Sequence, residues 1–459
     1  MYRIVCKTEK DAAALAELAG MFAPPAEFEI VSVSGREEKD IASISDTADA
    51  VLLSDDKEEN KAALYELLSR ETGKTLPWGI LTGVRPLKLY RQLCAGSEEE
   101  GIKTLRSRYL VSEARSELLR TIAGVQDKMR FSKDPGAVGI YVGIPFCPTR
   151  CSYCSFASNP YDEKGSKEYL EALLYEISRI SGIIKNKAFF AESIYIGGGT
   201  PTSLAEDDFE LLMRSVGEAF LGPRTVEFSV EAGRPDTITR AKLDSIKRHG
   251  ADRISVNPQS MKQRTLELIG RSHRVEDIYA AYDMARTAGI GCINMDLIAG
   301  LPEEDAADFS RTLDEIVRLE PENITVHTLA VKRASRLNEK DPSYGYRQAG
   351  IVSEMLQSCG ERMASEGYLP YYVYRQKHMA ANLENTGYSR PGFESVYNVR
   401  IMEEDQSIIA FGAGAISKFV DPDQSDKRKK IVRAANVTNY RIYIDRIEEM
   451  VERKEAQLR

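Results

Sequence analysis

The chain has 459 residues, of which 42% are hydrophobic and 29% are charged, and its formal net charge is −8. That length favours two or three domains, and the acidic balance argues against nucleic acid as the main partner. Neither a membrane-spanning apolar run nor the apolar core of a signal peptide is present, so we expect no membrane span and no export. The seven cysteines, an odd number, favour a reducing compartment and a cytoplasmic location.

Residues 1–130 form the first of three predicted regions, an additional N-terminal α/β accessory domain. Apolar residues recur at spacings of three and four over Asp11–Phe22, Lys57–Arg70 and Ser112–Lys128, which predicts three helices. The only tryptophan, Trp78, lies in a loop rich in glycine and proline. We interpret Trp78 as a structural anchor, with a role at the edge of a substrate or partner site as the alternative.

Short β-rich runs alternate with amphipathic helices in residues 131–340. This alternation predicts a parallel sheet with helices outside it, and six units predict an open, partial (β/α)6 barrel. Functional residues are then expected at the carboxyl ends of the strands. The expected strands are Gly139–Ile144, Ser193–Ile196, Thr225–Val230, Arg253–Val256, Cys292–Leu297 and Asn323–Val326. The expected helices are Lys167–Ile184, Glu206–Phe220, Pro235–His249, Glu276–Ala288 and Ala306–Leu319.

The alternation fades in residues 341–459, which we expect to form an α+β region that covers the substrate. A helix is predicted at Gln348–Glu366, followed by a tyrosine-rich run that begins at Tyr368. A glycine turn at Gly412 and a helical tail over Val437–Glu455 complete the chain. The basic run at residues 427–430 lies among aspartates and is interpreted as a solvated loop.

Cys147, Cys151 and Cys154 are the most informative residues, because three of the seven cysteines fall within eight positions. A compact loop with this spacing can direct three thiolates at one iron–sulfur cluster and leave one iron without a protein ligand. An open coordination position marks a reactive metal rather than a structural one. The sequence offers no paired Cys-x-x-Cys knuckle or histidine pair that would complete a zinc site.

The run Gly197-Gly-Gly-Thr-Pro-Thr follows a predicted strand and precedes a predicted helix. Consecutive glycines let a backbone approach a ligand closely and present its peptide groups as hydrogen-bond partners. The run matches neither a Walker loop nor the dinucleotide-binding fingerprint. Together with the cysteine loop one strand earlier, it indicates a small polar ligand beside the cluster.

The cysteine loop resembles the C-x-x-x-C-x-x-C signature of radical S-adenosylmethionine (SAM) enzymes, and Gly197 to Thr200 resembles their glycine motif for the amino group of SAM. From Tyr141 to about Phe419 the chain is similar to the oxygen-independent coproporphyrinogen III oxidase family. The matching segments include Asp-Arg-Ile-Ser at residue 252, Asn-Met-Asp-Leu-Ile-Ala-Gly-Leu-Pro at residue 294 and Gly-Ala-Ile-Ser at residue 414. Glu-Ala-Gly-Arg-Pro-Asp, Tyr-Arg-Gln-Lys and Asn-Leu-Glu-Asn-x-Gly-Tyr resemble the HemZ-like branch.

This resemblance implies a [4Fe–4S] cluster on Cys147, Cys151 and Cys154, with its open iron bound by the amino and carboxylate groups of SAM. It also implies a second SAM molecule. Positions that match contacts to the first SAM are Tyr141, Gly198, Glu231 and Ile416. Positions that match the lining of the second SAM site are Tyr153, Gly199, Thr200, Gln259, Arg271, Asp296 and Ala330.

The residue types suit these implied roles. A buried glutamate at a strand end can accept a hydrogen bond from an ammonium group or a ribose hydroxyl. The guanidinium of Arg271 offers a planar donor fork to a carboxylate, and Asp296 can bind the opposite charge. Without the resemblance, Glu231, Arg271 and Asp296 would be interpreted as ordinary salt-bridge residues.

The reaction implied by the resemblance is the oxidative decarboxylation of coproporphyrinogen III to protoporphyrinogen IX in haem biosynthesis. The chain would then be an oxidoreductase, a SAM-dependent coproporphyrinogen dehydrogenase, whose cofactors carry the difficult chemistry. An electron donor such as flavodoxin or ferredoxin would be its protein partner. Two alternatives stay open, a haem-binding chaperone and a radical SAM methyltransferase or haem-degrading enzyme that acts on a tetrapyrrole.

Two departures from the family bear on the choice of substrate. Residues 1–130 do not resemble the short N-terminal extension of the best-known oxidases. Phe156 stands where those oxidases carry a further cysteine, so the cysteine loop is closer to that of the haem-chaperone relatives. The His-Asn…Tyr-Trp pattern expected of a chaperone is absent after Tyr397-Asn-Val-Arg, however.

The remaining candidate groups have plainer interpretations. Each histidine is interpreted as a satisfied polar residue rather than a haem ligand, and each cysteine outside the loop as a buried apolar thiol. These histidines are His249, His273, His327 and His378, and these cysteines are Cys6, Cys94, Cys292 and Cys359. An acidic chain still needs a local cationic and aromatic surface for a substrate with four carboxylates. The best candidate is the tyrosine-rich run after Tyr368 with Arg375 and Lys377, near Arg333 and Arg336, and a packed core edge with solvated cations is the alternative.

Overall fold

The computed structural model describes residues 1–35, 44–83, 85–154, 158–330, 341, 344, 348–376, 383–421 and 431–458. A single sheet with the strand order β12-β13-β11-β10-β9-β8-β7-β4-β14-β15-β16 dominates it. The six strands from β11 to β4 in this order all run parallel to one another. They are β4 (Ala137–Ile144), β7 (Phe190–Gly198), β8 (Glu227–Glu231), β9 (Arg253–Ser255), β10 (Cys292–Ala299) and β11 (Asn323–Thr328). The predicted partial (β/α)6 barrel is therefore confirmed.

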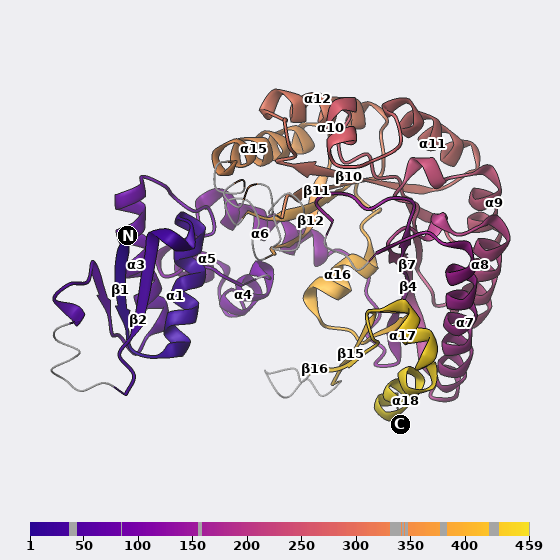
Figure 1. Cartoon of the computed structure of the whole chain (residues 1–459), viewed down its shortest axis with the longest axis horizontal. Helices are drawn as coiled ribbons and strands as arrows, with labels where there is room; N and C mark the ends of the chain where they lie inside the picture. Colours follow the sequence, from indigo (N-terminus) through magenta and orange to yellow (C-terminus); the bar gives the residue numbers. More distant parts are fainter. Residues whose placement is uncertain are drawn as a thin grey trace.

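Helices cover the outer face of this curved sheet, while its inner face lines the barrel interior (Figure 1). The outer helices are α7 (Glu163–Asn186), α8 (Glu206–Phe220), α9 (Arg240–Arg248), α11 (Val275–Thr287) and α12 (Ala306–Arg318), with the short α10 (Gln263–Leu268) between two of them. The predicted helix Pro235–His249 is divided, because Thr239 caps α9 by accepting a hydrogen bond from the Lys242 backbone N–H.

The first barrel strand, β4, shows why the barrel strands have mostly apolar sequences. In β4, Val138, Ile140, Val142 and Ile144 are all buried against the helices. The residues between them, including Tyr141, point to the opposite face, because side chains alternate along a strand. Parallel sheets are covered on both faces, so that most positions of such a strand are apolar or small.

The last third of the chain extends both edges of the barrel sheet. β14 (Ile408–Phe411) runs parallel to β4, and β15 (Ile416–Val420) and β16 (Ile431–Ala435) follow it antiparallel. At the other edge β13 (Asn385–Ser389) pairs antiparallel with β11 and with β12 (Leu369–Tyr374). The tyrosine-rich run is thus a strand, which the sequence pattern did not predict. The helices of this part are α15 (Ala349–Ser365), α16 (Val396–Glu403), α17 (Tyr440–Asp445) and α18 (Ile447–Leu458).

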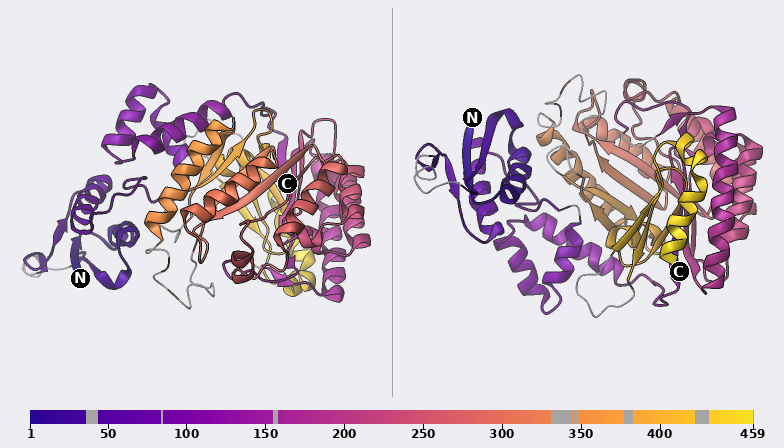
Figure 2. Two further views of the ribbon diagram at one scale, coloured as in Figure 1. Left: turned by 90° about the horizontal axis from the view of Figure 1, so that it is seen from above. Right: turned by 60° about the horizontal axis from the view of Figure 1, so that its bottom comes forward.

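The N-terminal part has a small sheet of its own, in agreement with the predicted α/β character. Its strands are parallel, in the order β2-β1-β3. They are β1 (Tyr2–Cys6), β2 (Phe28–Ser32) and β3 (Ala50–Leu52), packed with α1 (Glu9–Phe22) and α3 (Lys57–Thr72). Three further helices lead toward the barrel (Figures 1 and 2), namely α4 (Pro86–Leu93), α5 (Glu98–Ser107) and α6 (Glu113–Gln126). The domain limits at residues 130 and 340 stay predictions.

Trp78 joins this N-terminal part to the barrel. Its side chain is 1% exposed, and its indole Nε1–H donates to Glu384 Oε2 over 2.7 Å. Arg115 forms an ion pair with the other oxygen of Glu384 at 2.7 Å. Glu384 lies just before β13, and its backbone carbonyl accepts from the Thr328 hydroxyl at the end of β11. The interpretation of Trp78 as a structural anchor is therefore confirmed.

Arg375 belongs to the same buried contact, which contradicts its predicted place on an exposed substrate surface. It is 3% exposed, its guanidinium carbon lies 5.4 Å from the ring centroid of Trp78, and its Nη1 donates to the Leu81 carbonyl at 2.7 Å. The other members of that predicted surface, Lys377, Arg333 and Arg336, lie outside the described residues, as does the basic run 427–430.

The C-terminal tail packs along the first barrel helix (Figure 1). The predicted tail helix is interrupted at Arg446, so that α17 and α18 are separate. Lys454 of α18 forms a fully buried ion pair with Glu176 of α7 at 2.5 Å. The second oxygen of Glu176 accepts from the Gly412 backbone N–H at 2.9 Å, so the tail supports the predicted glycine turn. Within the described ranges, no helix combines the length and the apolarity that crossing a membrane requires.

Candidate functional site

The cysteine loop lies beyond the carboxyl end of β4. Cys147 ends the two-residue strand β5 (Phe146–Cys147), which pairs with β6 (Asn159–Pro160), and Cys151 and Cys154 lie between these strands. All three cysteines are half-buried, and in the described part of the chain none of them forms a disulfide bond. No three Cys, His, Asp or Glu side chains among the described residues converge as a site for one metal ion. Three cysteines on one loop are nevertheless the donor set that an iron–sulfur cluster requires.

The glycine run is locked against this loop. The Gly199 and Thr200 backbone N–H groups donate to the carbonyls of Ile144 and Phe146 at 2.8 and 2.7 Å. The Thr200 hydroxyl donates to Cys147 Sγ at 3.4 Å. A Cβ atom at Gly199 would lie 2.5 Å from the Phe146 carbonyl oxygen and 3.0 Å from Cys147 Sγ. Only glycine allows this close approach, and it fits a group held beside Cys147.

Glu231 ends β8 next to the same glycines. Tyr195 Oη donates to Glu231 Oε1 at 2.5 Å, and the Gly198 backbone N–H donates to Glu231 Oε2 at 3.1 Å. A Cβ atom at Gly197 would lie 2.8 Å from the Glu231 carboxyl group. Burial raises the pKa of Glu231 to about 7, the bond from Tyr195 opposes that shift, and the nearby charge of Asp296 adds to it. A cationic or hydroxyl-bearing ligand would satisfy this carboxyl group.

Three tyrosines stack beside Glu231. The ring centroids of Tyr195 and Tyr397 are 4.6 Å apart at an interplanar angle of 16°, and Tyr141 lies 6.3 Å from Tyr195. Tyr141 was predicted from the sequence, whereas Tyr195 and Tyr397 were not. Tyr195 could have been predicted, because it lies two residues before Gly197 on β7 and therefore points to the same side of the sheet. Tyr397 comes from α16, and no local pattern links it to the barrel.

Arg271 and Tyr153 form a second group beside the cysteine loop. Arg271 is 9% exposed, and its guanidinium donates to the Gly233 carbonyl at 3.0 Å and to Tyr153 Oη at 3.3 Å. Its Nε atom is buried and has no hydrogen-bond partner in the described part of the chain. A buried polar atom without a partner is costly, so an additional acceptor would be favourable here.

Gln259 is held in an unusual backbone conformation next to Asp296. Its φ angle is +67°, a region that glycine favours, and its backbone N–H donates to the Asp296 carbonyl at 2.9 Å. The Gln259 Oε1 atom is buried without a partner among the described residues. Strained backbone and unsatisfied polar groups are typical of ligand sites.

Asp296 lies on β10 and faces His327 of β11. Its Oδ1 atom accepts from Asn294 Nδ2 at 2.7 Å, and its Oδ2 atom lies 3.6 Å from His327 Nε2. Burial would raise the pKa of Asp296, but the bonds from His327 and Asn294 outweigh it and hold the pKa below its usual value. Near neutral pH, Asp296 is therefore ionised while Glu231 is partly protonated.

Two predicted site residues are less closely joined to the others. Ala330 follows β11 and is half-buried, and Ile416 begins β15 with 47% of its surface exposed. In the described part of the chain, no hydrogen bond links either residue to the other site residues. The assignment of all these residues to SAM stays a prediction.

The groups with plainer interpretations behave mostly as expected. His249 ends α9 and bonds to Glu210 Oε1 at 2.7 Å, and His378 lies outside the described residues. His273 is an exception to the prediction, because it is buried 3.7 Å from Asp236 and neither of its ring nitrogens has a hydrogen-bond partner among the described residues. Cys6, Cys292 and Cys359 are buried, whereas Cys94 is half-buried.

Comparison with known proteins places this arrangement in a family. Residues 141–316 match the family model described as the Radical SAM superfamily. HemZ of Bacillus subtilis, an oxygen-independent coproporphyrinogen-III oxidase-like protein, is 42% identical over 398 residues, which cover 84% of this chain and 78% of HemZ. The heme chaperone HemW of the same organism is 31% identical over 276 residues, which cover 60% of this chain and 69% of HemW.

A solved structure agrees with the family at the level of the fold. The coproporphyrinogen III oxidase HemN from Escherichia coli, a radical SAM enzyme, superposes with a TM-score of 0.53 and 23% identity over 73% of each chain. The chain therefore belongs to the radical SAM superfamily, whose cofactors are a [4Fe–4S] cluster and SAM, and within it to the family of oxygen-independent coproporphyrinogen-III oxidase-like proteins.

Proposed function

We propose that the chain is an oxidoreductase that converts two propionate side chains of coproporphyrinogen III into vinyl groups, giving protoporphyrinogen IX. The observation that carries this proposal is the similarity to HemZ, which covers 84% of the chain and so extends well beyond the superfamily match at residues 141–316.

In this proposal Cys147, Cys151 and Cys154 hold the cluster. When bound, the cluster and SAM supply a carbon radical by one-electron reduction. A donor such as flavodoxin or ferredoxin would supply the electron for that reduction. Each propionate would lose one hydrogen atom to the radical, then CO₂ and one electron, so that the reaction also needs a one-electron acceptor. The chain itself binds, orients and excludes water from the reacting carbon.

The remaining predicted residues divide between two SAM molecules. Glu231 and Tyr141, with Gly198 and Ile416, contact the SAM on the cluster. Arg271 would hold the carboxylate of the second SAM, since its buried Nε–H has no acceptor among the described residues. The other members of the second site are Tyr153, Gly199, Thr200, Gln259, Asp296 and Ala330.

Haem transfer is a second candidate function, favoured by the similarity to HemW and by one residue of the barrel. His327 is half-buried, with its Nδ1 atom 3.4 Å from Tyr374 Oη and its Nε2 atom 3.6 Å from Asp296. An imidazole inside a cavity is the usual protein ligand of haem iron. The absence of the chaperone pattern from the sequence after Tyr397 favours the oxidase instead.

An anaerobic assay of the reconstituted protein with coproporphyrinogen III, SAM and a reductant separates these functions. Formation of vinyl products with consumption of SAM is the expected result. Stoichiometric binding of haem without vinyl products would support the chaperone. Formation of S-adenosylhomocysteine would instead support a methyltransferase.

A further inference from the structure

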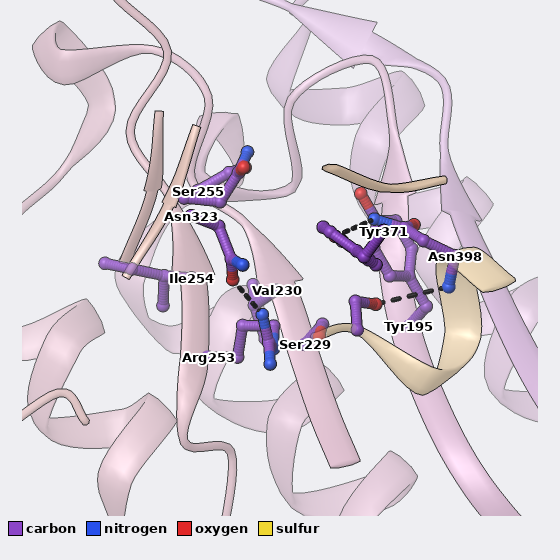
Figure 3. Close-up of a pocket in the computed structure, with 11 residues that line it drawn as sticks. Tyr195, Ser229, Val230, Arg253, Ile254, Ser255, Asn323, Tyr371 and Asn398 are labelled. Carbon is purple, nitrogen blue, oxygen red and sulfur yellow. Dashed lines mark hydrogen bonds between the residues drawn. The ribbon is translucent and has the colours of Figure 1, made fainter. Parts of the chain in front are cut away.

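A pocket with a cavity volume of about 30 Å³ lies inside the barrel, where Arg253 and Asn323 begin the strands β9 and β11 (Figure 3). Arg253 and Asn323 form one wall, and Tyr371 and Asn398 lie on the opposite side. Tyr195 also lines the pocket, and its hydroxyl donates to Glu231. The pocket is therefore one side chain away from a proposed SAM contact, yet none of the predicted SAM contacts lines it.

Arg253 brings a positive charge to this pocket without a carboxylate partner. Its Nη1 donates to Asn323 Oδ1, and its Nη2 donates to the Phe393 carbonyl at 2.7 Å. Both acceptors are neutral, and in the described part of the chain Arg253 forms no ion pair within 4.0 Å. A guanidinium stays protonated and has five N–H donors, so further acceptors would be favourable.

Asn323 adds a second donor whose direction is fixed. It is 1% exposed, and its Oδ1 atom accepts from Arg253 and from the Cys292 thiol at 3.2 Å. Because arginine can only donate, the oxygen must face Arg253 and the amide nitrogen must point away from it. That Nδ2 atom has no partner among the described residues, and neither has the Oγ atom of Ser255, which is 8% exposed and lines the same pocket.

The carboxylate of Glu227, whose charge acts on Arg253, is hydrogen-bonded to other groups. Glu227 lies outside the pocket lining and accepts from the Ser229 hydroxyl at 3.0 Å, the Ser395 hydroxyl at 2.8 Å and the Val396 backbone N–H at 2.6 Å. Three donors thus satisfy Glu227, while Arg253, Asn323 and Ser255 still offer N–H and O–H groups to the pocket. A planar cation with two neutral donors is the environment that a carboxylate prefers.

We propose that this pocket is a carboxylate subsite, which receives one propionate arm of the substrate while the ring lies toward the carboxyl ends of the strands. This inference rests on the proposed function for the identity of the carboxylate. A cavity volume of about 30 Å³ is far too small for a macrocycle and admits only a small polar group, such as the carboxylate at the end of a side arm. Holding one arm here would fix the distance of the reacting arm from the SAM site beyond Tyr195.

The test compares three variants of the anaerobic holoenzyme. Arg253→Met removes the charge, Arg253→Lys restores it without the planar fork, and Asn323→Asp places a negative charge in an almost unchanged shape. Affinity for coproporphyrin III, the stable oxidised form of the substrate, is measured by fluorescence titration, and KM is measured with coproporphyrinogen III. We expect Arg253→Met and Asn323→Asp to weaken both by about tenfold or more, and Arg253→Lys to recover part of the loss.

Arg240→Met is the matched control, because Arg240 is exposed on α9 and pairs with Asp244 on the same helix. It removes the same charge and should change neither affinity nor KM. Thermal unfolding and iron content establish that each variant is folded and loaded. Since Asn323→Asp creates an ion pair with Arg253, it should fold even if Arg253→Met does not.

Sodium propionate is the second probe and separates the possible sources of the carboxylate. Competition by propionate that needs Arg253, with coproporphyrin binding unaffected by the variants, would show a site for a small free acid and overturn the substrate arm. Unchanged binding of both probes in Arg253→Met and Asn323→Asp would overturn the subsite. Arg253-dependent binding of coproporphyrin without vinyl products would contradict the proposed function and keep the subsite.

Discussion

Tyr195 and Glu231 share a hydrogen bond of 2.5 Å between the neighbouring strands β7 and β8. The bond favours the ionised carboxyl group, whereas burial, the largest influence, and the charge of Asp296 favour the protonated one. The balance raises the pKa of Glu231 to about 7, so that its charge can respond to a ligand near neutral pH.

Glu231 should therefore couple SAM binding to proton release. A cation bound beside the carboxyl group requires its ionised form, so SAM affinity is expected to increase as the pH rises from about 6 to about 8. In Glu231→Gln this dependence should disappear, and affinity at pH 8 should fall about tenfold. Calorimetry in two buffers of different ionisation enthalpy measures the released proton. Equal affinity of the wild-type protein at both pH values would contradict this role.

Cluster binding should depend on each cysteine of the loop. Serine presents a hard oxygen in place of a soft thiolate, so Cys151→Ser should lose the broad cluster absorbance and SAM cleavage. Cys359→Ser is the control, because Cys359 is buried in α15, outside the cysteine loop. It should retain about four irons per chain, the number in one cubane cluster. A normal iron content in Cys151→Ser would show that the loop does not hold the cluster.

Arg271 should contribute to one class of SAM binding only. Removing a charged donor from a shielded site costs about 1.5–3 kcal/mol, so Arg271→Ala should weaken that class by about tenfold or more. Equilibrium binding with labelled SAM counts the classes. Arg318→Ala serves as the control, since Arg318 is exposed and pairs with Glu315 on the same helix. A single SAM per chain, bound equally by both variants, would exclude the second site.

Two glycine replacements should change stability in opposite directions. A Cβ atom at Gly197 would lie 2.7 Å from the Tyr195 ring and 2.8 Å from Glu231, whereas a Cβ atom at Gly182 in α7 would meet nothing within 4 Å. Gly197→Ala is therefore expected to lower the free energy of unfolding by about 1–3 kcal/mol. Gly182→Ala should raise it by about 0.5–1 kcal/mol, because alanine favours a helix. Urea unfolding measures both, and a stable Gly197→Ala protein would show that Glu231 can move.

Trp78 provides a signal for the junction between the N-terminal part and the barrel. As the only tryptophan, it should emit at short wavelength in the native state and report on the contact with Glu384. We expect its emission and the circular dichroism to change in one urea transition, because the contact couples the two parts. Trp78→Phe leaves a buried carboxylate with one donor fewer, at a cost of about 1–3 kcal/mol. Two separated transitions in the wild-type protein would contradict this coupling.

The barrel could be predicted from the sequence because the apolar periodicity of each of its helices and strands lies within a short stretch of the chain. The helix Glu206–Phe220 has the predicted bounds, and Val138 to Ile144 reads as a strand by its alternation with small residues. The strand Leu369–Tyr374 was missed because Tyr371 and Tyr372 are both buried, which hides the alternation. Arg375 is buried because it packs against Trp78, which is remote in sequence. The residues next to an arginine in the sequence do not show whether it packs against a distant aromatic ring or is exposed to solvent.

The same distinction applies to the candidate site. The cysteine loop and the glycine run are contiguous motifs, and among the residues implied with them Gly198, Glu231 and Ala330 end or follow barrel strands, whereas Ile416 lies on β15 outside the six barrel strands. Tyr397 and the donors of the barrel pocket belong to no motif, because strand register and α16 bring them together only in the folded chain.

The ion pair between Glu176 and Lys454 implies an order of events during folding. Glu176 and Lys454 are 278 residues apart, so the carboxylate of α7 is synthesised long before its cationic partner in α18. Until α18 has formed, the carboxylate has no charge to balance it in the interior, and the Gly412 turn lacks its support. This part of the barrel is therefore expected to complete its packing only after α18 has been made.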